Sequence, residues 1–318
     1  MSRSRELPDD SPLVSALIPT YRRQHVLERS IRSILAQTID DLEVVVVDDE
    51  PSPLTRKIVE SIDDPRVRYV AHPENRGLAA SRTTGVREAR GRFVAFNDDD
   101  DEWAPEKLEK QLQAMHAHGD DVVVHSYERW IKPDGSERIR RIHLDGDVHR
   151  ELLETDMVLM QTLLVPRRAF DEVGEFDAEL TNYMDMDMNI RLSRRFRYVT
   201  VPEPLFIGHV TPGSLSRSET GRIRALERIL GKYPEYQRDR RLRSRWEYRL
   251  ARKYGAIGDR RGWRRKLWQA LRLNPANGRA WVMFGLGLIA GPGAHHRTSA
   301  LWSHWANRIR GRATAWMS

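Results

Sequence analysis

Four consecutive aspartates, Asp98 to Asp101, form the segment of the chain with the clearest potential for chemistry. Adjacent carboxylates repel one another, and the run contains no Lys or Arg that would neutralise them. Hard divalent cations prefer carboxylate oxygens, so the run predicts a site for Mn²⁺ or Mg²⁺. An EF-hand is excluded, because the loop lacks the Gly and the distal Glu of that motif. The alternative is a solvated acidic turn, since short charge runs usually face water.

The residues on either side place this run at the end of a strand. Residues 93–96 are aromatic, β-branched or small, which predicts a short strand buried on both faces. Pro105 opens a predicted helix that carries Leu108, Leu112 and Met115 on one face. The aspartates therefore follow the carboxyl end of a central strand, where open α/β sheets bind their ligands.

The preceding segments alternate between strand and helix patterns. Strands are predicted at 13–18, 42–47 and 67–71, and helices at 27–35, 54–62 and 78–89. This alternation predicts an α/β fold with a mostly parallel central sheet covered on both faces. Polar residues follow three of the strands, namely Thr20 with Tyr21, Asp48 with Asp49, and the aspartate run. Three such clusters at one edge of a sheet predict one shared site.

Beyond Met115 the pattern becomes less regular. Residues 122–127 and 128–142 predict strands around a turn at Pro133-Asp134-Gly135. A further strand is predicted at 160–165. The glycine-rich signatures of dinucleotide-binding folds and of P-loop enzymes are absent from the sequence. A nucleotide could still be held by acidic side chains on its base and ribose and by a metal on its diphosphate.

Five segments, taken in order, resemble a family 2 glycosyltransferase of the GT-A fold. They are residues 14–21, 33–38, 45–49, 75–82 and 91–103. The resemblance implies an inverting enzyme that uses a nucleotide-diphosphate sugar as donor. It also implies a nucleotide pocket lined by Pro19, Thr20 and Tyr21, with Asp49 on the base and Arg82 near the diphosphate.

The same resemblance assigns the metal ligands. Asp98 and Asp100 match the two acids of the family's D-x-D motif, which holds Mn²⁺ or Mg²⁺ on the diphosphate. With four Asp in succession the register is open by one residue, so Asp99 could replace either neighbour in binding the cofactor. His209 stands where the family often places a His near the metal or the phosphates.

The resemblance further identifies an acceptor helix in residues 183–192. The family usually introduces this helix with Glu-Asp, whereas this chain has Met184-Asp185. Asp185 is therefore the candidate general base, and Asp187 is the second choice. The alternative is that Asp185 only caps the helix, a common role for Asp.

The function that follows is sugar transfer from a UDP-, GDP- or dTDP-linked donor to a hydroxyl of a glycan or a lipid-linked acceptor. The rival hypothesis is a binding protein, in which a catalytically degenerate GT-A fold carries a basic tail that recruits an anionic partner.

The charge distribution divides the chain in two. Residues 217–318 contain 24 Lys and Arg against 6 Asp and Glu, whereas residues 1–216 contain 29 against 40. We therefore expect a GT-A domain at 12–215 and a basic helical domain at 216–318. Residues 251–281 resemble a single tetratricopeptide-type hairpin, a motif that is normally repeated.

Basic helices with Trp suit an anionic membrane surface, nucleic acid, or the neutralisation of an acidic domain. We favour the membrane surface, because residues 281–290 are apolar and Trp302 and Trp305 follow. Nucleic acid is disfavoured, since no known binding motif is present. Residues 1–12 lack an apolar core typical of a signal peptide, and 280–290 is too short to span a bilayer. The expected location is cytoplasmic, peripheral to the inner face of the membrane.

Overall fold

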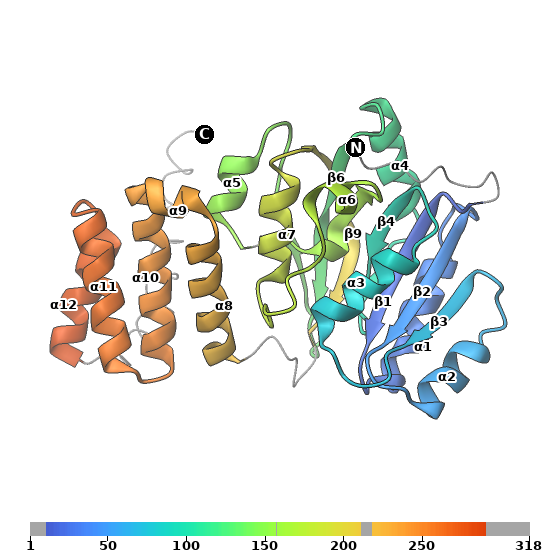
Figure 1. The fold of residues 1–318 in the computed structure, drawn as a ribbon, viewed down its shortest axis with the longest axis horizontal. Helices are drawn as coiled ribbons and strands as arrows, with labels where there is room; N and C mark the ends of the chain where they lie inside the picture. The colour runs from blue at the N-terminus through green and yellow to red at the C-terminus, as the bar shows by residue number, and fades with distance from the viewer. Residues whose placement is uncertain (1–10, 157, 211–217, 291–318) are drawn as a thin grey trace. The chain divides into compact units, whose positions relative to one another are not determined.

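The computed structural model describes residues 11–156, 158–210 and 218–290. The chain forms two compact units, 1–214 and 215–318 (Figure 1). The predicted domain boundary at 215/216 lies outside the described residues, as do Trp302 and Trp305.

The described part of unit 1 contains one sheet of nine strands, ordered β3-β2-β1-β4-β8-β6-β9-β5, with β7 paired to β6. The strands are β1 (Val14–Thr20), β2 (Leu42–Asp48), β3 (Val67–Ala71), β4 (Phe93–Phe96), β5 (Glu102–Trp103), β6 (Val122–Ile131), β7 (Glu137–Arg140), β8 (Leu163–Pro166) and β9 (Arg197–His209). Strands β3, β2, β1 and β4 are parallel, and so are β6 and β9. Strand β8 is antiparallel to β4 and β6, as are β5 to β9 and β7 to β6. Most paired residues are thus parallel, which confirms the predicted α/β class.

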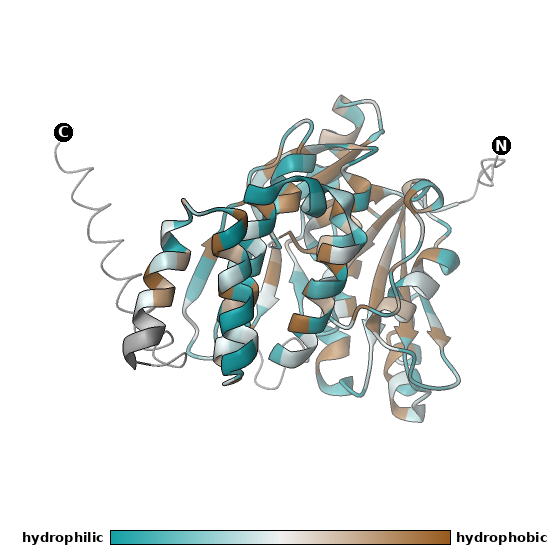
Figure 2. Ribbon diagram, turned by 60° about the vertical axis from the view of Figure 1, so that its left-hand side comes forward, coloured by the Kyte–Doolittle hydropathy of each residue, from teal (hydrophilic) through white to brown (hydrophobic). Residues whose placement is uncertain are grey.

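Helices cover both faces of this sheet. The helices of unit 1 are α1 (Gln24–Leu35), α2 (Pro53–Glu60), α3 (Leu78–Glu88), α4 (Lys107–Ala117), α5 (His149–Glu154), α6 (Ala169–Val173) and α7 (Met184–Leu192). Alternate residues of β1, such as Ala16 and Ile18, share one core with α1, α2 and α4. The intervening Leu17 faces α3, where it lies 3.1 Å from the position that a Cβ on Gly85 would take. This burial on both faces explains the continuously apolar strands, which are largely brown in Figure 2.

Two expectations need correction. Residues 160–162 form a 3₁₀ turn, η1 (Met160–Thr162), and the strand begins only at Leu163. The turn is favoured because the backbone N–H of Thr162 donates to the carbonyl of Leu159 and the Thr162 hydroxyl donates to the same oxygen. Residues 128–131 continue β6, so the region predicted as 128–142 contains only β7 as a new strand. The turn at 133–135 is confirmed, with Gly135 at φ 77°.

Unit 2 is helical where it is described. Its helices are α8 (Glu219–Lys232), α9 (Pro234–Arg238), α10 (Arg240–Ala256), α11 (Arg260–Leu273) and α12 (Gly278–Ala290). Side chains of Ser218, Asp239 and Asp259 cap the starts of α8, α10 and α11. The predicted tetratricopeptide-type hairpin would comprise the end of α10, all of α11 and the start of α12, and it stays a prediction. None of the described helices combines the length and apolar character needed to cross a bilayer.

Candidate active site

The aspartate run follows β4 directly and is held against the neighbouring β1 and α1. The hydroxyl of Thr20, the last residue of β1, donates to Asp99 over 2.8 Å. Asn97 is fully buried, and its amide nitrogen donates to the Ser30 hydroxyl at 2.9 Å and to the Asp101 carbonyl at 3.0 Å. These bonds give the buried polar side chain of Asn97 partners in both α1 and the aspartate run.

Three arginines from outside the run contact it, and two of them, Arg23 and Arg82, form ion pairs with its carboxylates. Arg23, at the start of α1, pairs with Asp99 at 3.2 Å and with Asp100. Arg29 donates to the Asp100 carbonyl at 2.6 Å, and Arg82 of α3 contacts Asp98 at 3.3 Å. Asp99, Asp100 and Asp101 are 4%, 8% and 5% exposed, so the run is not a solvated turn. The sequence alone did not reveal these arginines as partners of the run, because they lie outside it.

The loop remains electrostatically strained despite these arginines. Burial raises the pKa of Asp99 to about 7, against the lowering effect of Arg23. Burial also raises the pKa of Asp98, and the carboxylates of Asp185 and Asp100 raise it further. The pKa of Asp101 lies well above its usual value, through burial first and then through Asp98 and Asp100. Such a cluster of destabilised carboxylates favours an added cation.

The donor set fits a divalent ion that takes only part of its ligands from the protein. The Asp98 side chain is 32% exposed and that of Asp100 is 11% exposed. Within the described residues, no three His, Cys, Asp or Glu side chains group closely enough for a complete metal site. Asp98 and Asp100 can therefore supply carboxylate oxygens, with phosphate oxygens and water completing the ligand shell.

Arg82 joins the aspartate run, Asp98 to Asp101, to α7, the predicted acceptor helix. Its guanidinium donates to Asp185 Oδ1 at 2.5 Å through Nη1 and to Asp98 Oδ1 at 3.3 Å through Nη2. The Arg82 side chain is only 2% exposed. Burial lowers the pKa of Arg82, but Asp185 and Asp98 more than offset this, so the guanidinium stays charged.

The 3₁₀ turn η1 bonds to the same two carboxylates, Asp98 and Asp185, that Arg82 contacts. Arg82, the two aspartates and η1 thus form a closed ring of polar contacts, which we call the polar ring. The backbone N–H of Met160 donates to Asp185 Oδ2 at 3.1 Å, and the amide of Gln161 donates to Asp98 Oδ2 at 2.5 Å. Buried Gln161 Oε1 and Arg82 Nε have no hydrogen-bond partner among the described residues. Unpaired buried groups of this kind often mark functional sites. The sequence analysis did not identify Gln161. The only indication in the sequence was that two polar residues, Gln161 and Thr162, interrupt the otherwise apolar run 158–165.

The two aspartates of α7 have different surroundings. Asp185 does not cap this helix, since the cap position is Tyr183 and no side-chain cap bond forms there. Asp187 is fully buried and bound by Arg191 Nε at 3.0 Å and Nη2 at 2.8 Å. Residues two apart on a helix point in different directions. The structure thus brings Asp185, and not Asp187, to the ring.

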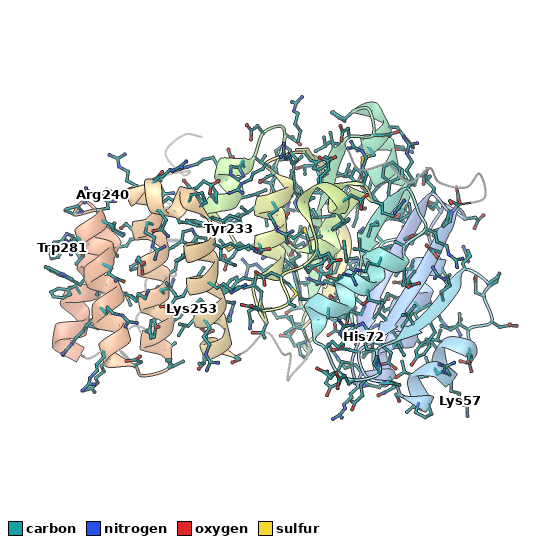
Figure 3. The ribbon with its side chains drawn as sticks, in the orientation of Figure 1. Lys57, His72, Tyr233, Arg240, Lys253 and Trp281 are labelled. Carbon is teal, nitrogen blue, oxygen red and sulfur yellow. The ribbon has the colours of Figure 1, made fainter. Side chains whose placement is uncertain are left out.

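Asp49 organises the loop between β3 and α3. Its carboxylate accepts from the backbone N–H of Arg76 at 2.9 Å and of Gly77 at 2.7 Å, and it contacts His72 Nδ1 at 2.8 Å. Gly77 has φ 86° and precedes α3, a conformation that side chains disfavour. His72 also contacts the Thr84 hydroxyl at 2.8 Å (Figure 3). A base contact by Asp49 would be added to these existing bonds.

The remaining predicted residues lie around the same sheet edge. Pro19 is a buried residue of β1 paired with Val47, and Tyr21 is half-buried beneath the guanidinium of Arg22, 5.1 Å from its ring centroid. His209 ends β9, where its N–H donates to Asp101 at 2.9 Å and its ring contacts Glu102 at 2.7 Å. The described contacts therefore tie His209 to Asp101 and Glu102 rather than to Asp98 or Asp100.

Comparison with known proteins agrees with this geometry. Residues 15–172 match the family described as Glycosyl transferase family 2. One relative is the Escherichia coli UDP-Glc:alpha-D-GlcNAc-diphosphoundecaprenol beta-1,3-glucosyltransferase WfgD. It is 37% identical over 119 residues, which are 37% of this chain and 47% of that protein. The chain spans about half the length of the curated relatives it matches.

Two solved structures share the fold across most of the chain. S. aureus TarS 1–349 in complex with UDP-GlcNAc has a TM-score of 0.63 and 18% identity, covering 90% of this chain and 92% of that one. The mannosyltransferase PcManGT from Pyrobaculum calidifontis, in complex with GDP-Man and Mn²⁺, has a TM-score of 0.56 and 20% identity. That match covers 95% of this chain and 86% of the other. At these identities the likeness establishes the GT-A fold.

Proposed function

Because the chain belongs to glycosyl transferase family 2, we propose that it moves a sugar from a nucleotide-diphosphate sugar to an acceptor hydroxyl with inversion at the anomeric carbon. The observation that carries this proposal is the Arg82 bridge, which unites Asp98 and Asp185 in one site. A donor-side carboxylate and an acceptor-side carboxylate are the two groups that such a transfer needs at close range.

On the donor side, Asp98 and Asp100 would hold Mn²⁺ or Mg²⁺. The ion, when bound, supplies Lewis-acid stabilisation of the charge that develops on the departing diphosphate. In our assignment Asp99 holds the loop in place, since it is 4% exposed and accepts a hydrogen bond from the Thr20 hydroxyl at the end of β1. The nucleotide would lie over Pro19, Thr20 and Tyr21, with its base near Asp49.

On the acceptor side, Asp185 would act as general base. It accepts the proton of the acceptor hydroxyl while that oxygen forms a bond to the anomeric carbon and the bond to the diphosphate breaks. Direct displacement inverts the configuration and requires no protein nucleophile. Arg82 and the N–H of Met160 hold one oxygen of Asp185 each, which fixes the orientation of the carboxylate.

The relatives guide the choice of substrates. WfgD is named for UDP-glucose and for a diphosphoundecaprenol-linked acceptor, and TarS was solved with UDP-GlcNAc. We therefore propose a UDP-sugar as the first donor to test, followed by GDP- and dTDP-sugars, and a lipid-linked or glycan hydroxyl as acceptor. A lipid-linked acceptor would place the chain at the inner face of the membrane.

The decisive experiment incubates the full chain with each nucleotide-sugar and an undecaprenyl-diphosphate-linked sugar acceptor, in Mn²⁺, in Mg²⁺ and in EDTA. We expect nucleoside diphosphate release that depends on metal and acceptor, with a product of inverted anomeric configuration by NMR. Product of retained configuration would refute the mechanism. Donor binding by calorimetry without turnover on lipid-linked or glycan acceptors would favour the rival binding protein.

A further inference from the structure

Helix α11 presents two chemically different faces. Its inner face, which includes Trp263, Leu267 and Ala270, packs into the core of unit 2. The outer residues recur at helical spacing on the opposite side and are all exposed. We call them the outer α11 face, and they are Arg261, Arg264, Arg265, Trp268 and Arg272.

The inner and outer cations of this helix differ in their partners. Lys266 points inward and pairs with Glu227 at 2.8 Å and Glu247 at 3.2 Å. Helix α11 has no acidic residue of its own. Among the described residues, none forms an ion pair with Arg261, Arg264 or Arg272. The outer arginines are thus available to an external anion.

Trp268 is the unusual member of this face. Its side chain is 60% exposed in the middle of the arginines. Tryptophan is normally well buried, because it carries a large apolar surface. On the adjacent α12, Trp281 and Val282 are also exposed, at 50% and 46%. Figure 3 labels Trp281. Exposed Trp side chains are enriched at membrane–water interfaces, where the amphipathic ring lies at the level of the headgroups.

We propose that the outer α11 face docks on an anionic phospholipid bilayer. The arginines would pair with lipid phosphates, while the Trp268 indole enters the headgroup region, where amphipathic rings are favoured. The charge of residues 217–318, with 24 basic and 6 acidic residues, complements such a surface. The proposal locates the contact on α11 and does not require the apolar segment 281–290. It also does not depend on sugar transfer.

The test is co-sedimentation of the full chain with vesicles of phosphatidylcholine alone and of phosphatidylcholine with phosphatidylglycerol. The double substitution R261E/R264E should lower partitioning onto the anionic vesicles by roughly thirtyfold or more, since each basic residue contributes about 1 kcal/mol near such a surface. W268S should also lower it. High salt should release the wild-type chain, because the attraction is screened.

The matched control is R224E/R238E, which changes the net charge equally on α8 and α9. Both arginines are exposed, and α8 packs against α10 in unit 2. We expect this variant to retain most of its vesicle binding. Equal loss in both variants, or binding by W268S equal to wild type, would overturn the proposal. Wild-type binding to duplex DNA but not to the anionic vesicles would identify nucleic acid as the partner instead.

Circular dichroism spectra and melting temperatures of the four proteins establish that each variant is folded. Because vesicle binding is measured without donor or acceptor, its failure would leave the proposed transferase activity untouched. Conversely, an inactive chain that binds anionic vesicles through α11 would leave this proposal standing.

Discussion

Arg82 and Asp185 are 103 positions apart in the sequence, yet Nη1 of the arginine lies 2.5 Å from Oδ1 of the aspartate. The same guanidinium also contacts Asp98. Helix α3, which precedes β4 and the aspartate run in the sequence, is thereby joined to α7, the helix that supplies the proposed base.

Asp185→Asn removes the proposed base and keeps the shape of the side chain. We expect turnover to fall by about 10²–10⁴, the usual contribution of a positioned general base. Donor affinity, measured by calorimetry, should stay close to wild type because this carboxylate serves the acceptor. Glu172→Gln, at an exposed residue of α6, is the control and should keep full activity. Loss of donor binding in Asp185→Asn would place this residue on the donor side.

Arg82→Met removes the shared cation and leaves two carboxylates facing each other. Breaking a buried ion pair from one side typically costs about 3–5 kcal/mol, so urea denaturation should show a loss of that order. Arg82→Met combined with Asp185→Asn should recover part of this loss, because one of the stranded charges is gone. Additive losses in the double variant would contradict the bridge.

Gln161→Ala removes the amide that donates to Asp98. A hydrogen bond to a charged group contributes about 1.5–3 kcal/mol, so the Mn²⁺ concentration for half-maximal activity should change at least severalfold. Gln161→Glu keeps the size but cannot donate, and it adds a negative charge beside Asp98. We expect that variant to bind metal with altered affinity and to turn over slowly. Metal activation curves identical to wild type in both variants would remove Gln161 from the site.

Lys107 gives the structure a distinct pH dependence. Burial lowers the pKa of Lys107 to about 7, and its ammonium lies 4.1 Å from the centre of a Trp103 ring. The unfolded chain therefore binds more protons between pH 7 and the ordinary lysine pKa, so stability rises with pH in that window. Relative to Lys107→Met, the wild-type unfolding free energy should increase by up to about 1.4 kcal/mol per pH unit there. Parallel curves for the two proteins would show that Lys107 does not titrate in this window.

Gly262 of α11 tests the packing between α10 and α11. A Cβ at this position would lie 2.3 Å from a ring carbon of Tyr254, whose hydroxyl is held by Glu227. Gly262→Ala should lower the unfolding free energy by about 1–3 kcal/mol. Gly231→Ala in α8 meets no atom within 4 Å and should stabilise the helix by about 0.5–1 kcal/mol. A stabilising Gly262→Ala would mean that the helices are more widely spaced.

The hydrophobic pattern was sufficient to predict the parallel strands β1 to β4. β3 and β4 were predicted at their observed bounds. For β4 the reason is that a strand buried on both faces is continuously apolar, whereas β3 is only partly buried and was indicated by its Val and Tyr residues. The long strand β9 was not predicted. It contains Pro202 and Pro204, which argue against a strand, and the register with β6 shifts in that region.

The positions of the site residues along the chain were predictable, whereas their partners were not. Asp98 and Asp185 stood out by residue type and by resemblance. Arg23 and Gln161 did not, because their roles depend on contacts 77 and 63 residues away in sequence. The sequence did not distinguish Asp187 from Asp185. The structure does, because the two side chains point in different directions from α7 and only Asp185 contacts Arg82.

The turn η1 would impose a mechanical constraint on the proposed sugar transfer. Met160 and Gln161 are consecutive residues, and one holds Asp185 while the other holds Asp98. A displacement of either carboxylate would therefore reach the other through this turn. If donor binding shifts Asp98, the acceptor's affinity changes by some factor, and acceptor binding must change donor affinity by the same factor. Ordered substrate addition can thus arise from a turn of three residues, without the closure of a lid.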